Sequence, residues 1–405
     1  MDKNSILIFG AGKIGRSFIG QLFGQSGYHI LFVDIDPEIV DQLNQRNSYP
    51  VVIKGKIEKT ILVENVKALS ALDVDAVKNA IARTSIMAVS VGKNALEKII
   101  PVIAAGLMLR QKLSPDSPLD IIIAENMRSA NLFIRSQLIQ LLPENFPLEK
   151  MLGLVETSIG KMVPIMTKED LKQDPLMIFA EPYNNLILDR KGFKGTIPKV
   201  EGLSPKKNIK AWVDRKAFIH NMGHATSAYI GNFYQPHATY IYEVLDNKNI
   251  LNNVRLTMLQ AATILRAHYP EEFTYQDLEK HIDDLLDRFQ NRSLKDTVFR
   301  VGQDLSRKLG IDDRFAGIIK MALKKGLKYD RIIKSMAYGF FFNKPNQQGN
   351  LNNQDEQFLR MLNEMGVKST LEILCGFHPE NDSFLIDELE LQYLKLKKKE
   401  AKLEI

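Results

Sequence analysis

A lysine, an asparagine and a histidine at short spacing are the residues of this sequence best suited to chemistry. Lys216, Asn221 and His224 lie in the segment 214–231, which has a helical pattern. At about 100° per residue, their side chains fall within an arc of roughly 140°, together with small residues. A solvated helix face would carry several long charged side chains instead. The pattern therefore indicates a ligand site, and it fits equally well a polar face packed on a neighbouring domain.

The chemistry open to these three side chains is oxidation of an alcohol. Hydride transfer from an alcohol needs a base for the hydroxyl proton and donors for the developing negative oxygen. A lysine serves as the base when burial or a nearby cation lowers its pKa. No glutamate follows His220, so the H-E-x-x-H zinc pattern is absent, and Cys375 is the single cysteine. We therefore expect a site without a metal.

A G-x-G-x-x-G loop lies near the N-terminus and consists of Gly10, Ala11, Gly12, Lys13, Ile14 and Gly15. It follows an apolar run and precedes a helical pattern, the context of a dinucleotide-binding loop. The first glycine permits the tight turn, the second lets the pyrophosphate approach, and the third lets helix and strand pack closely. The free N–H groups at the helix start would then meet the pyrophosphate.

Asp34 follows the glycine loop at the end of the next apolar run. A carboxylate about 20 residues after the loop accepts hydrogen bonds from the adenosine ribose and repels a ribose 2′-phosphate. Ile35 and Asp36 come next, so no arginine directly follows. The sequence predicts NAD rather than NADP as the cofactor; the alternative is a glycine-rich turn with a purely structural role.

The elements that position these residues differ between the two halves of the chain. Buried apolar runs alternate with helical patterns in the first half, at 5–10, 29–36, 84–92 and 120–126. That alternation predicts an α/β fold with a parallel sheet. A further alternating segment, 50–69, predicts a hairpin insertion.

Glycine, proline and lysine concentrate over 190–208, which is typical of a domain junction. Beyond it the pattern is mostly helical. We expect a Rossmann-type NAD-binding domain over 1–195 and a mostly α-helical substrate and catalytic domain over 196–405.

Composition narrows the partners and the location. The net charge is +6 over 405 residues and is not gathered in one stripe, so nucleic acid is not an expected partner. The surplus would instead steer an anionic substrate or cofactor inward. No apolar stretch reaches the length of a membrane span. With one cysteine and no signal-peptide pattern, we expect a cytoplasmic protein. The oligomeric state is open, and a monomer is compatible with the sequence.

The glycine loop, the pair Glu125-Asn126 and the spacing Lys216-x4-Asn221-x2-His224 resemble the polyol-specific long-chain dehydrogenases. Five stretches are similar to the branch of that family that acts on mannitol phosphate, and they extend to about residue 315: FGAGKIGRSFIG, AENMRSAN, FKGTIPKVEGL, RKAFIHNMGHATSAYIG and DRFQNRSLKDTVFRVGQDLSRKLGIDDR. The resemblance implies a Rossmann-type domain joined to a helical domain, no metal, and reversible NAD-dependent oxidation of D-mannitol 1-phosphate to D-fructose 6-phosphate.

The resemblance also assigns roles to residues. Lys216 would be the general acid/base, and Asn221 and His224 would hold and polarise the reacting oxygen. Asn126 would lie near the nicotinamide and the substrate. The chain departs from the family in one place: many relatives carry Asp-Arg before Ile-x-Pro, where this chain has Gly160-Lys161-Met162-Val163-Pro164. A polar contact that some relatives make is missing there.

A phosphate site is predicted in the segment 295–308, which carries Lys295, Arg300, Arg307 and Lys308. A phosphate monoester is held well by bidentate arginine together with a lysine. We expect Arg300, Arg307 and Lys308 to bind the substrate phosphate, although cations on helices are commonly solvated. Lys161 and Lys194 are the next candidates.

Two other functions fit the same residues. The first is a related activity on free mannitol or on a hexuronate such as fructuronate. The second is a non-catalytic NAD-binding regulator. The intact lysine, asparagine and histidine set argues against the regulator, because a sensor needs no proton acceptor.

Overall fold

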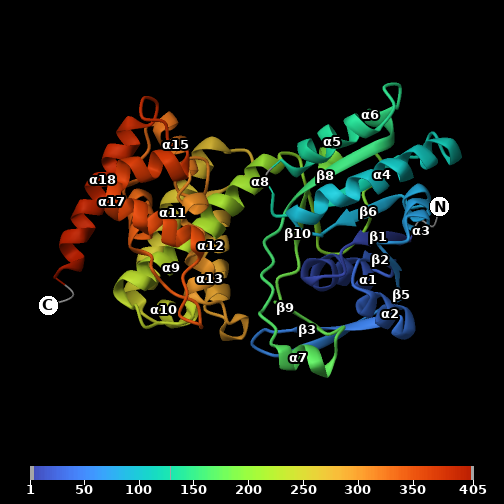
Figure 1. Ribbon diagram of the computed structural model, residues 1–405, viewed down its shortest axis with the longest axis horizontal. Helices are drawn as coiled ribbons and strands as arrows, with labels where there is room; N and C mark the ends of the chain where they lie inside the picture. The colour runs from blue at the N-terminus through green and yellow to red at the C-terminus, as the bar shows by residue number, and fades with distance from the viewer. Residues whose placement is uncertain (1–3, 128, 403–405) are drawn as a thin grey trace. The chain divides into compact units, whose positions relative to one another are not determined.

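The computed structural model describes residues 4–127 and 129–402. The chain divides into two compact units, Met1–Trp212 and Val213–Ile405, coloured blue to green and green to red in Figure 1. The segment 196–212, expected in the second domain, thus lies in the first unit. The reason is local: β11 (Leu203–Lys206) pairs with β10 (Leu186–Asp189) and extends the sheet of the first unit.

The first unit is built on an eight-stranded sheet of order β11-β10-β8-β7-β6-β1-β2-β5. Its other strands are β1 (Ser5–Phe9), β2 (His29–Asp34), β5 (Val66–Ser70), β6 (Ile86–Val89), β7 (Leu119–Ile123) and β8 (Leu152–Ser158). The six strands from β8 to β5 pair in parallel, and β10 pairs antiparallel to β8. The predicted Rossmann-type parallel sheet is confirmed.

A second, three-stranded sheet has the order β4-β3-β9. β3 (Ser48–Ile53) and β4 (Lys59–Glu64) form an antiparallel hairpin, as predicted for this region. The expected hairpin extended to residue 69, but the strand that begins at Val66 pairs with β2 in the main sheet. β9 (Ile178–Ala180) joins β3 in parallel from more than a hundred residues away, a pairing that local patterns cannot indicate.

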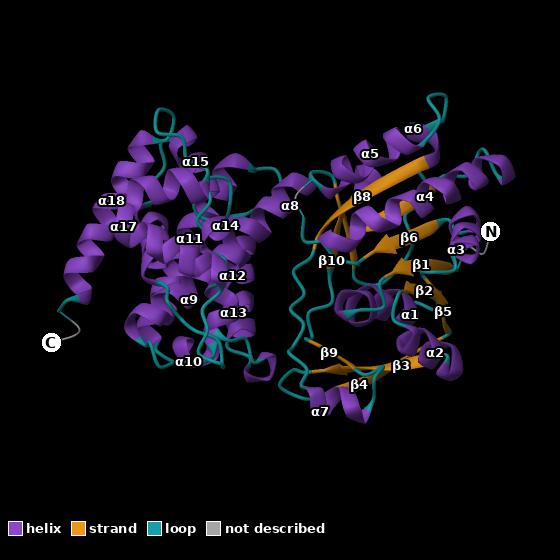
Figure 2. Cartoon of the chain, in the orientation of Figure 1, coloured by secondary structure: helices purple, strands orange, loops and turns teal. Residues whose placement is uncertain are grey.

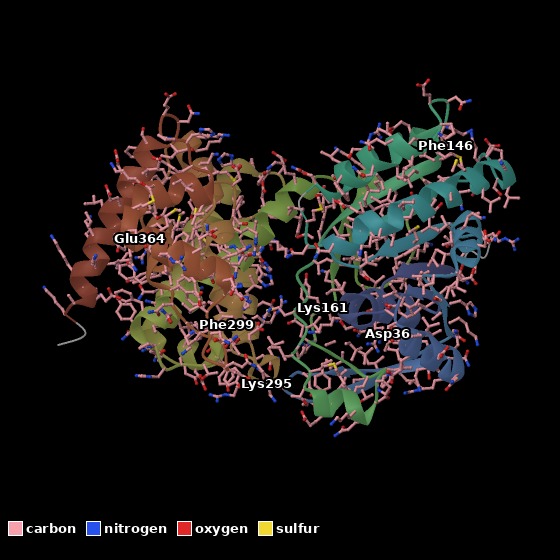
Figure 3. The ribbon with its side chains drawn as sticks, in the orientation of Figure 1. Asp36, Phe146, Lys161, Lys295, Phe299 and Glu364 are labelled. Atoms are coloured by element: carbon pink, nitrogen blue, oxygen red, sulfur yellow. The ribbon has the colours of Figure 1, made fainter. Side chains whose placement is uncertain are left out.

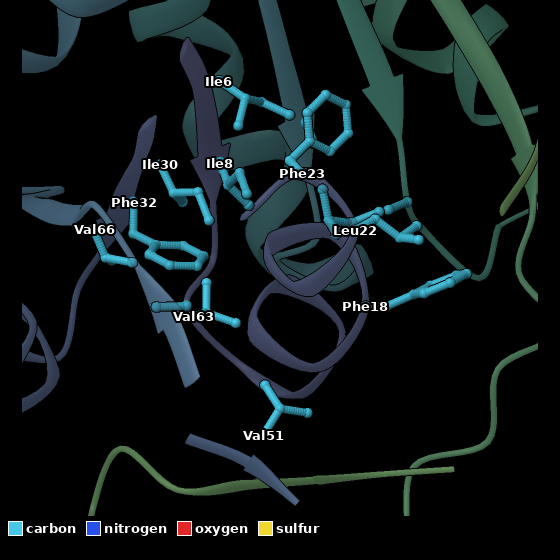
Figure 4. Packing of buried hydrophobic residues seen from close by; sticks show 14 of the residues in the cluster. Ile6, Ile8, Phe18, Leu22, Phe23, Ile30, Phe32, Val51, Val63 and Val66 are labelled. Carbon is cyan, nitrogen blue, oxygen red and sulfur yellow. The ribbon is translucent and has the colours of Figure 1, made fainter. Parts of the chain in front are cut away.

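Helices cover both faces of the main sheet. The helices of the first unit are η1 (Gly15–Gly20, a π-helix), α1 (Gln21–Gln25), α2 (Pro37–Arg46), α3 (Val74–Arg83), α4 (Lys93–Leu113), α5 (Ala130–Leu141), α6 (Leu148–Met151), α7 (Lys168–Gln173), which lies beside the small sheet in Figure 1, and η2 (Arg190–Gly192, a 3₁₀ turn). Successive side chains of a strand point to opposite faces. Ile6 and Ile8 therefore join the core under η1 and α1, where Phe18, Leu22 and Phe23 also pack (Figure 4).

On the other face, Leu7 and Phe9 join a separate core with side chains of α3, α4 and α5, such as Ile81, Ile103 and Ile134. Parallel strands that are buried on both faces have near-continuous apolar sequences, as in LDIII of β7. The two cores hold the carboxyl ends of β1, β2 and β7 in register at one sheet edge.

In the described residues of the second unit, helices are the only regular elements, apart from one isolated β-bridge between Tyr240 and Thr297 (Figure 2). α8 (Ile209–Arg215) leads into it. Its elements are η3 (Lys216–Asn221, a π-helix), α9 (Met222–Tyr234), α10 (Ile241–Leu245), α11 (Lys248–His268), α12 (Tyr275–Phe289), η4 (Arg292–Leu294), α13 (Val298–Gly302), α14 (Leu305–Lys308), α15 (Ala316–Lys325), α16 (Asp330–Tyr338), η5 (Gly339–Phe341), α17 (Asn353–Cys375) and α18 (Ser383–Glu400). The mostly helical second half predicted from the sequence is confirmed.

α9 is the central helix of the second unit. It contacts α10, α11, α13 and α16, and most of its side chains are buried. Small residues allow this close packing: a Cβ added to Gly223 would lie 2.5 Å from the sulfur of Met258 on α11. In the described part of the chain, no helix combines the length and the apolar character needed to cross a membrane.

Candidate active site

The helix that carries Lys216, Asn221 and His224 contains a π-turn, η3, which runs directly into α9. The sequence predicts a regular α-helix here, so the structure corrects that expectation. Five residues of α-helix overshoot a full turn by about 140°, whereas a π-turn is closed by i→i+5 hydrogen bonds and overshoots less. The extra residue brings Lys216 and Asn221 closer to one line on the helix face. π-turns of this kind are frequent at functional sites.

Lys216 is the first residue of the π-turn and is partly buried. Burial, and then the charge of Arg314, lower the pKa of its ammonium group to about 8. A lysine with an unperturbed pKa would be protonated almost completely at neutral pH. Lys216 therefore holds an appreciable neutral fraction near physiological pH, which a proton acceptor requires.

His224 is a neutral imidazole held between an aromatic ring and a carboxylate. Its ring stacks on Phe289 with centroids 4.4 Å apart and planes 8° from parallel. Nε2 lies 3.4 Å from Oδ2 of Asp296, yet it is buried and makes no hydrogen bond among the described residues. Burial, followed by the charges of Arg300, Lys308 and Arg314, lowers the His224 pKa well below its usual value. An orphaned, buried ring nitrogen is suited to bind a ligand oxygen.

Arg314 is a residue of this site that no motif or spacing in the sequence indicates. It is 9% exposed. Its Nε donates to the Asp313 carboxylate at 2.8 Å, and its Nη1 donates to the backbone carbonyl of Asn221 at 3.3 Å. The contact joins the π-turn to a residue 93 positions later in the chain. No helical period relates such positions, and only membership of the family-like stretch 287–314 pointed to this arginine.

The residues expected to bind phosphate have different surroundings. Lys308 is buried, and its Nζ donates to the Val301 carbonyl at 2.8 Å. Burial, then the charges of Arg314 and Arg307, lower its pKa to about 7. Arg300 is about half exposed and forms an ion pair with Asp296, the carboxylate next to His224. The structure thus brings Arg300 and Lys308 to the neighbourhood of His224.

Arg307 and Lys295 are less closely tied to the site. Arg307 is about half exposed and pairs with Asp304 and with Asp313 at 3.5 Å. Lys295 is exposed, and it is the residue with left-handed backbone that ends η4 (Figure 3). Asp296, which follows Lys295, is buried, and burial raises its pKa while Arg300 opposes that rise. No motif or spacing in the sequence indicates Asp296 either.

The first unit carries the glycine loop at the carboxyl edge of the sheet, where β1, β2 and β7 end. Gly10 has a φ of 92°, and a Cβ there would lie 2.6 Å from the Ser90 carbonyl oxygen. A Cβ on Gly15 would overlap the Gly10 carbonyl. Around Gly12, by contrast, an added Cβ would meet open space. Packing explains two of the glycines, and Gly12 is open to the approach of a ligand.

Asp34 ends β2 and contacts the loop directly. Its Oδ2 accepts a hydrogen bond from the Ala11 N–H at 2.6 Å, and its Oδ1 accepts one from the Asp36 N–H at 3.0 Å. The carboxylate therefore holds the loop, and its oxygens keep lone pairs for further donors. Lys13 is exposed and Ile14 is partly buried at the start of the following helix.

Arg16 is a buried cation behind the glycine loop, and no sequence pattern indicates its role. Its Nε donates to the Ala11 carbonyl at 2.6 Å, and its Nη1 donates to the Leu176 carbonyl at 2.7 Å. Burial lowers the Arg16 pKa, and the charge of Asp34 opposes that effect. Tyr49, fully buried, donates its hydroxyl to the Arg16 carbonyl at 2.9 Å. Arg16 therefore links the glycine loop to β3, through Tyr49, and to the segment before β9, through Leu176.

Glu125 and Asn126 follow β7 at the same sheet edge. The Glu125 carboxylate accepts hydrogen bonds from the Val91 and Gly92 N–H groups at 2.7 and 3.0 Å, and burial raises its pKa. Asn126 is exposed. Glu125 therefore ties the loop after β7 to the loop after β6 (86–89), and Asn126 faces solvent on that edge.

The two reserve candidates for phosphate have other contacts. Lys161 is buried, and its Nζ donates to Gln21 Oε1 at 3.1 Å and to Asn184 Oδ1 at 2.9 Å (Figure 3). Lys194 is exposed, and its backbone N–H donates to Asp120 at 2.8 Å. Within residues 4–127 and 129–402, no cluster of three His, Cys, Asp or Glu side chains is placed to hold a metal ion.

Both units match known sequence families. Residues 4–202 match the mannitol dehydrogenase Rossmann domain, and residues 208–374 match the mannitol dehydrogenase C-terminal domain. The chain belongs to the mannitol dehydrogenase family. The family matches therefore meet close to the junction at residue 212 that separates the two compact units.

The fold is similar to that of a solved structure. Mannitol 2-dehydrogenase from Pseudomonas fluorescens, in a ternary complex with NAD and D-mannitol, is similar with a TM-score of 0.76 and 15% identity, over 99% of this chain and 93% of that chain. Two proteins are more distant. Ketopantoate reductase from Staphylococcus aureus has a TM-score of 0.44 and 14% identity, over 83% of this chain and 97% of that chain. For 2-dehydropantoate 2-reductase from Geobacter metallireducens the values are 0.46 and 14%, over 82% and 98%.

Proposed function

We propose that this mannitol dehydrogenase family member is an NAD-dependent oxidoreductase that interconverts D-mannitol 1-phosphate and D-fructose 6-phosphate. The observation that carries the proposal is the set of cations around His224: the charges of Arg300, Lys308 and Arg314 all lower its pKa. Lys308 and Arg314 are buried. Arg314 pairs with Asp313, but Lys308 makes no ion pair among the described residues and donates to the Val301 carbonyl. Burying a cation without a counterion is costly, and a substrate dianion would supply that counterion. A free polyol would not.

The proton step is assigned to Lys216. With a pKa of about 8, its amine accepts the hydroxyl proton during oxidation and its ammonium returns that proton during reduction. The role uses one side chain in both directions, as microscopic reversibility requires.

Asn221 and His224 are assigned to the reacting oxygen. The orphaned Nε2 of His224 gains a partner when the substrate oxygen binds, and a neutral imidazole with its proton on that nitrogen donates to the developing charge. The backbone of Asn221 is held in place, because Arg314 donates a hydrogen bond to its carbonyl. Its side-chain amide is left to orient the same oxygen.

The residues of the glycine loop fit NAD. The open space at Gly12 admits a pyrophosphate, the helix start offers N–H donors, and the Asp34 carboxylate suits ribose hydroxyls. When bound, NAD supplies or accepts the hydride. Asn126, exposed on the same edge, is assigned to contact with the nicotinamide and the substrate.

A related activity on free mannitol or on a hexuronate is the second candidate. It is favoured by the ion pairs that Arg300 and Arg307 already make with Asp296, Asp304 and Asp313. These ion pairs neutralise part of the positive charge that would attract a substrate phosphate. A hexuronate carries one carboxylate and would need fewer cations than a phosphate.

The deciding experiment is NADH oxidation by the purified protein with fructose 6-phosphate, fructose and fructuronate in parallel. We expect fructose 6-phosphate to have the highest kcat/KM. Preference for fructose or fructuronate would replace the phosphate assignment with the second candidate. No turnover of any of the three would favour a non-catalytic NAD-binding protein.

A second measurement locates the phosphate contact. Arg300→Ala should raise the KM for fructose 6-phosphate strongly and leave any activity on fructose nearly unchanged. Equal losses on both substrates would mean that Arg300 supports the fold or the reacting centre through Asp296. Arg307→Ala serves as the comparison, since Arg307 is not among the cations that act on His224.

A further inference from the structure

A polar pocket lies in the helical unit, at the end of α9 opposite to His224. Its volume is about 450 Å³, and its walls come from α9, α11, α16 and α18. Tyr234, on its α9 wall, is ten residues after His224, which places the two about 15 Å apart along the helix. The pocket is therefore distinct from the candidate active site.

Three cations line this pocket: Arg331, Lys334 and Lys399. No carboxylate is among the lining residues. Arg331 and Lys334 lie on α16, one turn apart, and the Lys399 ammonium lies 5.0 Å from the ring centroid of Tyr234. No ion pair joins any of the three to an acidic side chain within 4–127 and 129–402. On an ordinary solvated helix face, acidic residues commonly alternate with the basic ones.

The rest of the lining consists largely of hydrogen-bonding groups. The hydroxyls of Tyr234 and Tyr338 lie 2.9 Å apart, and those of Thr257 and Ser335, both buried, lie 3.2 Å apart. Three asparagines at the start of α11 add amide donors and acceptors: Asn247, Asn249 and Asn253. Such groups match the hydroxyls of a small organic molecule better than they match an apolar partner.

From the shape and the charge together, we propose that this pocket binds a small phosphorylated molecule. Its phosphate would meet the Arg331 guanidinium, which can bind two oxygens at once, and the Lys334 and Lys399 ammonium groups. Its hydroxylated part would contact the asparagine amides and the tyrosine hydroxyls. Lys399 lies beyond residue 374, where the match to the family domain ends. Family membership therefore does not imply this site.

The test is equilibrium dialysis of the full-length protein against radiolabelled inorganic phosphate at constant ionic strength. The double variant Arg331→Gln/Lys334→Gln should weaken binding at one site about tenfold or more. The matched control is Lys324→Gln/Lys325→Gln, which removes the same charge from exposed positions at the end of α15. The control should bind phosphate as the wild type does.

Lys399→Gln provides a second variant at an exposed position that is safe for folding. It should weaken the same binding event several-fold, with an unchanged circular dichroism spectrum. Unchanged phosphate binding in both pocket variants would overturn the proposal, as would a wild type that binds no phosphate. An equal loss in the control variant would show a general charge effect and would also overturn it. None of these outcomes depends on turnover of fructose 6-phosphate, so the two proposals stand or fall separately.

Discussion

Lys216 is the single residue on which the proposed chemistry depends most. Replacing it by alanine removes the proton acceptor, while the glycine loop that would hold NADH is untouched. We expect Lys216→Ala to lower kcat by on the order of 10²- to 10⁴-fold, the usual effect of a positioned acid/base group. NADH affinity, measured by fluorescence titration, should stay the same. Near-normal turnover in this variant would remove Lys216 from the mechanism.

Burial is the larger cause of the lowered Lys216 pKa, and the positive charge of Arg314 is the second cause. The oxidation rate should rise with pH as Lys216 loses its proton, with a midpoint near its pKa of about 8. Arg314→Gln removes a cation that disfavours the ammonium form. We expect that midpoint to move to higher pH.

The pH profile of mannitol 1-phosphate oxidation by NAD measures this shift. Lys320→Gln is a suitable control, because Lys320 is partly exposed and pairs with Asp312 at 3.2 Å. An unchanged midpoint in Arg314→Gln, together with a raised substrate KM, would assign Arg314 to phosphate binding alone.

Asp34 combines two tasks that a substitution can separate. Asp34→Ala removes the ribose contact and also the acceptor for the Ala11 N–H. The KM for NAD should therefore rise, and the ratio of kcat/KM with NAD to kcat/KM with NADP should fall. Asp34→Asn keeps a neutral acceptor for the loop and should retain more NAD affinity. Initial rates with both cofactors measure the ratio. A wild type that already prefers NADP would show that the role given to Asp34 is mistaken.

At the scale of elements, the π-turn η3 sets the direction of the reacting groups. It holds one residue more than an α-helical turn. Deleting Ala217 should convert it to an α-turn while α8 and α9 keep their packing. We expect a folded protein whose free energy of unfolding is close to that of the wild type. Lys216 and Asn221 would then be four residues apart in an α-helix, about 40° from one line, so turnover should fall less than in Lys216→Ala.

Deleting Ser227 within α9 is the control for that experiment. Ser227 is fully buried in a regular helix, so its deletion rotates every later residue of α9 out of its contacts. Urea unfolding should show a large loss of stability there and a small one for the Ala217 deletion. Similar losses in both would mean that the π-turn is needed for packing and does not act mainly on the reacting groups.

Local patterns predicted the elements better than the contacts between them. The glycine loop, the β3–β4 hairpin and the face with Lys216, Asn221 and His224 all follow from spacing within one segment. Arg16 and Arg314 could not be found in this way, because their partners lie 160 and 93 residues away. The π-turn was missed for a different reason: it depends on the backbone hydrogen-bond pattern, and a hydrophobic period is too coarse to reveal one added residue.

At the scale of the whole molecule, the helical unit should be sensitive to acid. Burial lowers the pKa values of His220, His224 and His281 well below the usual value. These histidines stay neutral in the folded state but take up protons in the unfolded state below about pH 6.5. Stability is therefore fully present above that pH and falls as the pH drops, by up to about 1.4 kcal/mol per pH unit for each histidine.

Urea unfolding between pH 7.5 and 5.5 tests this sensitivity. His281→Gln should reduce the slope of stability against pH by about a third of the histidine contribution. His237→Gln, at an exposed position outside this group, should leave the slope unchanged. A flat stability profile through this range would contradict the assignment of three neutral buried histidines.

The anchor of Arg16 also has a consequence during translation. The arginine and its acceptor at Leu176 are 160 residues apart in the chain. A ribosome that adds about 5–20 residues per second needs roughly 8–32 s to synthesise that interval. β3 ends at Ile53 and its partner β9 begins at Ile178, so β3 has no partner on that side for most of this interval. Meanwhile the apolar residues that pack beneath η1 stay partly exposed. The nascent first unit should therefore be a client of chaperones until the segment that contains β9 has left the ribosome.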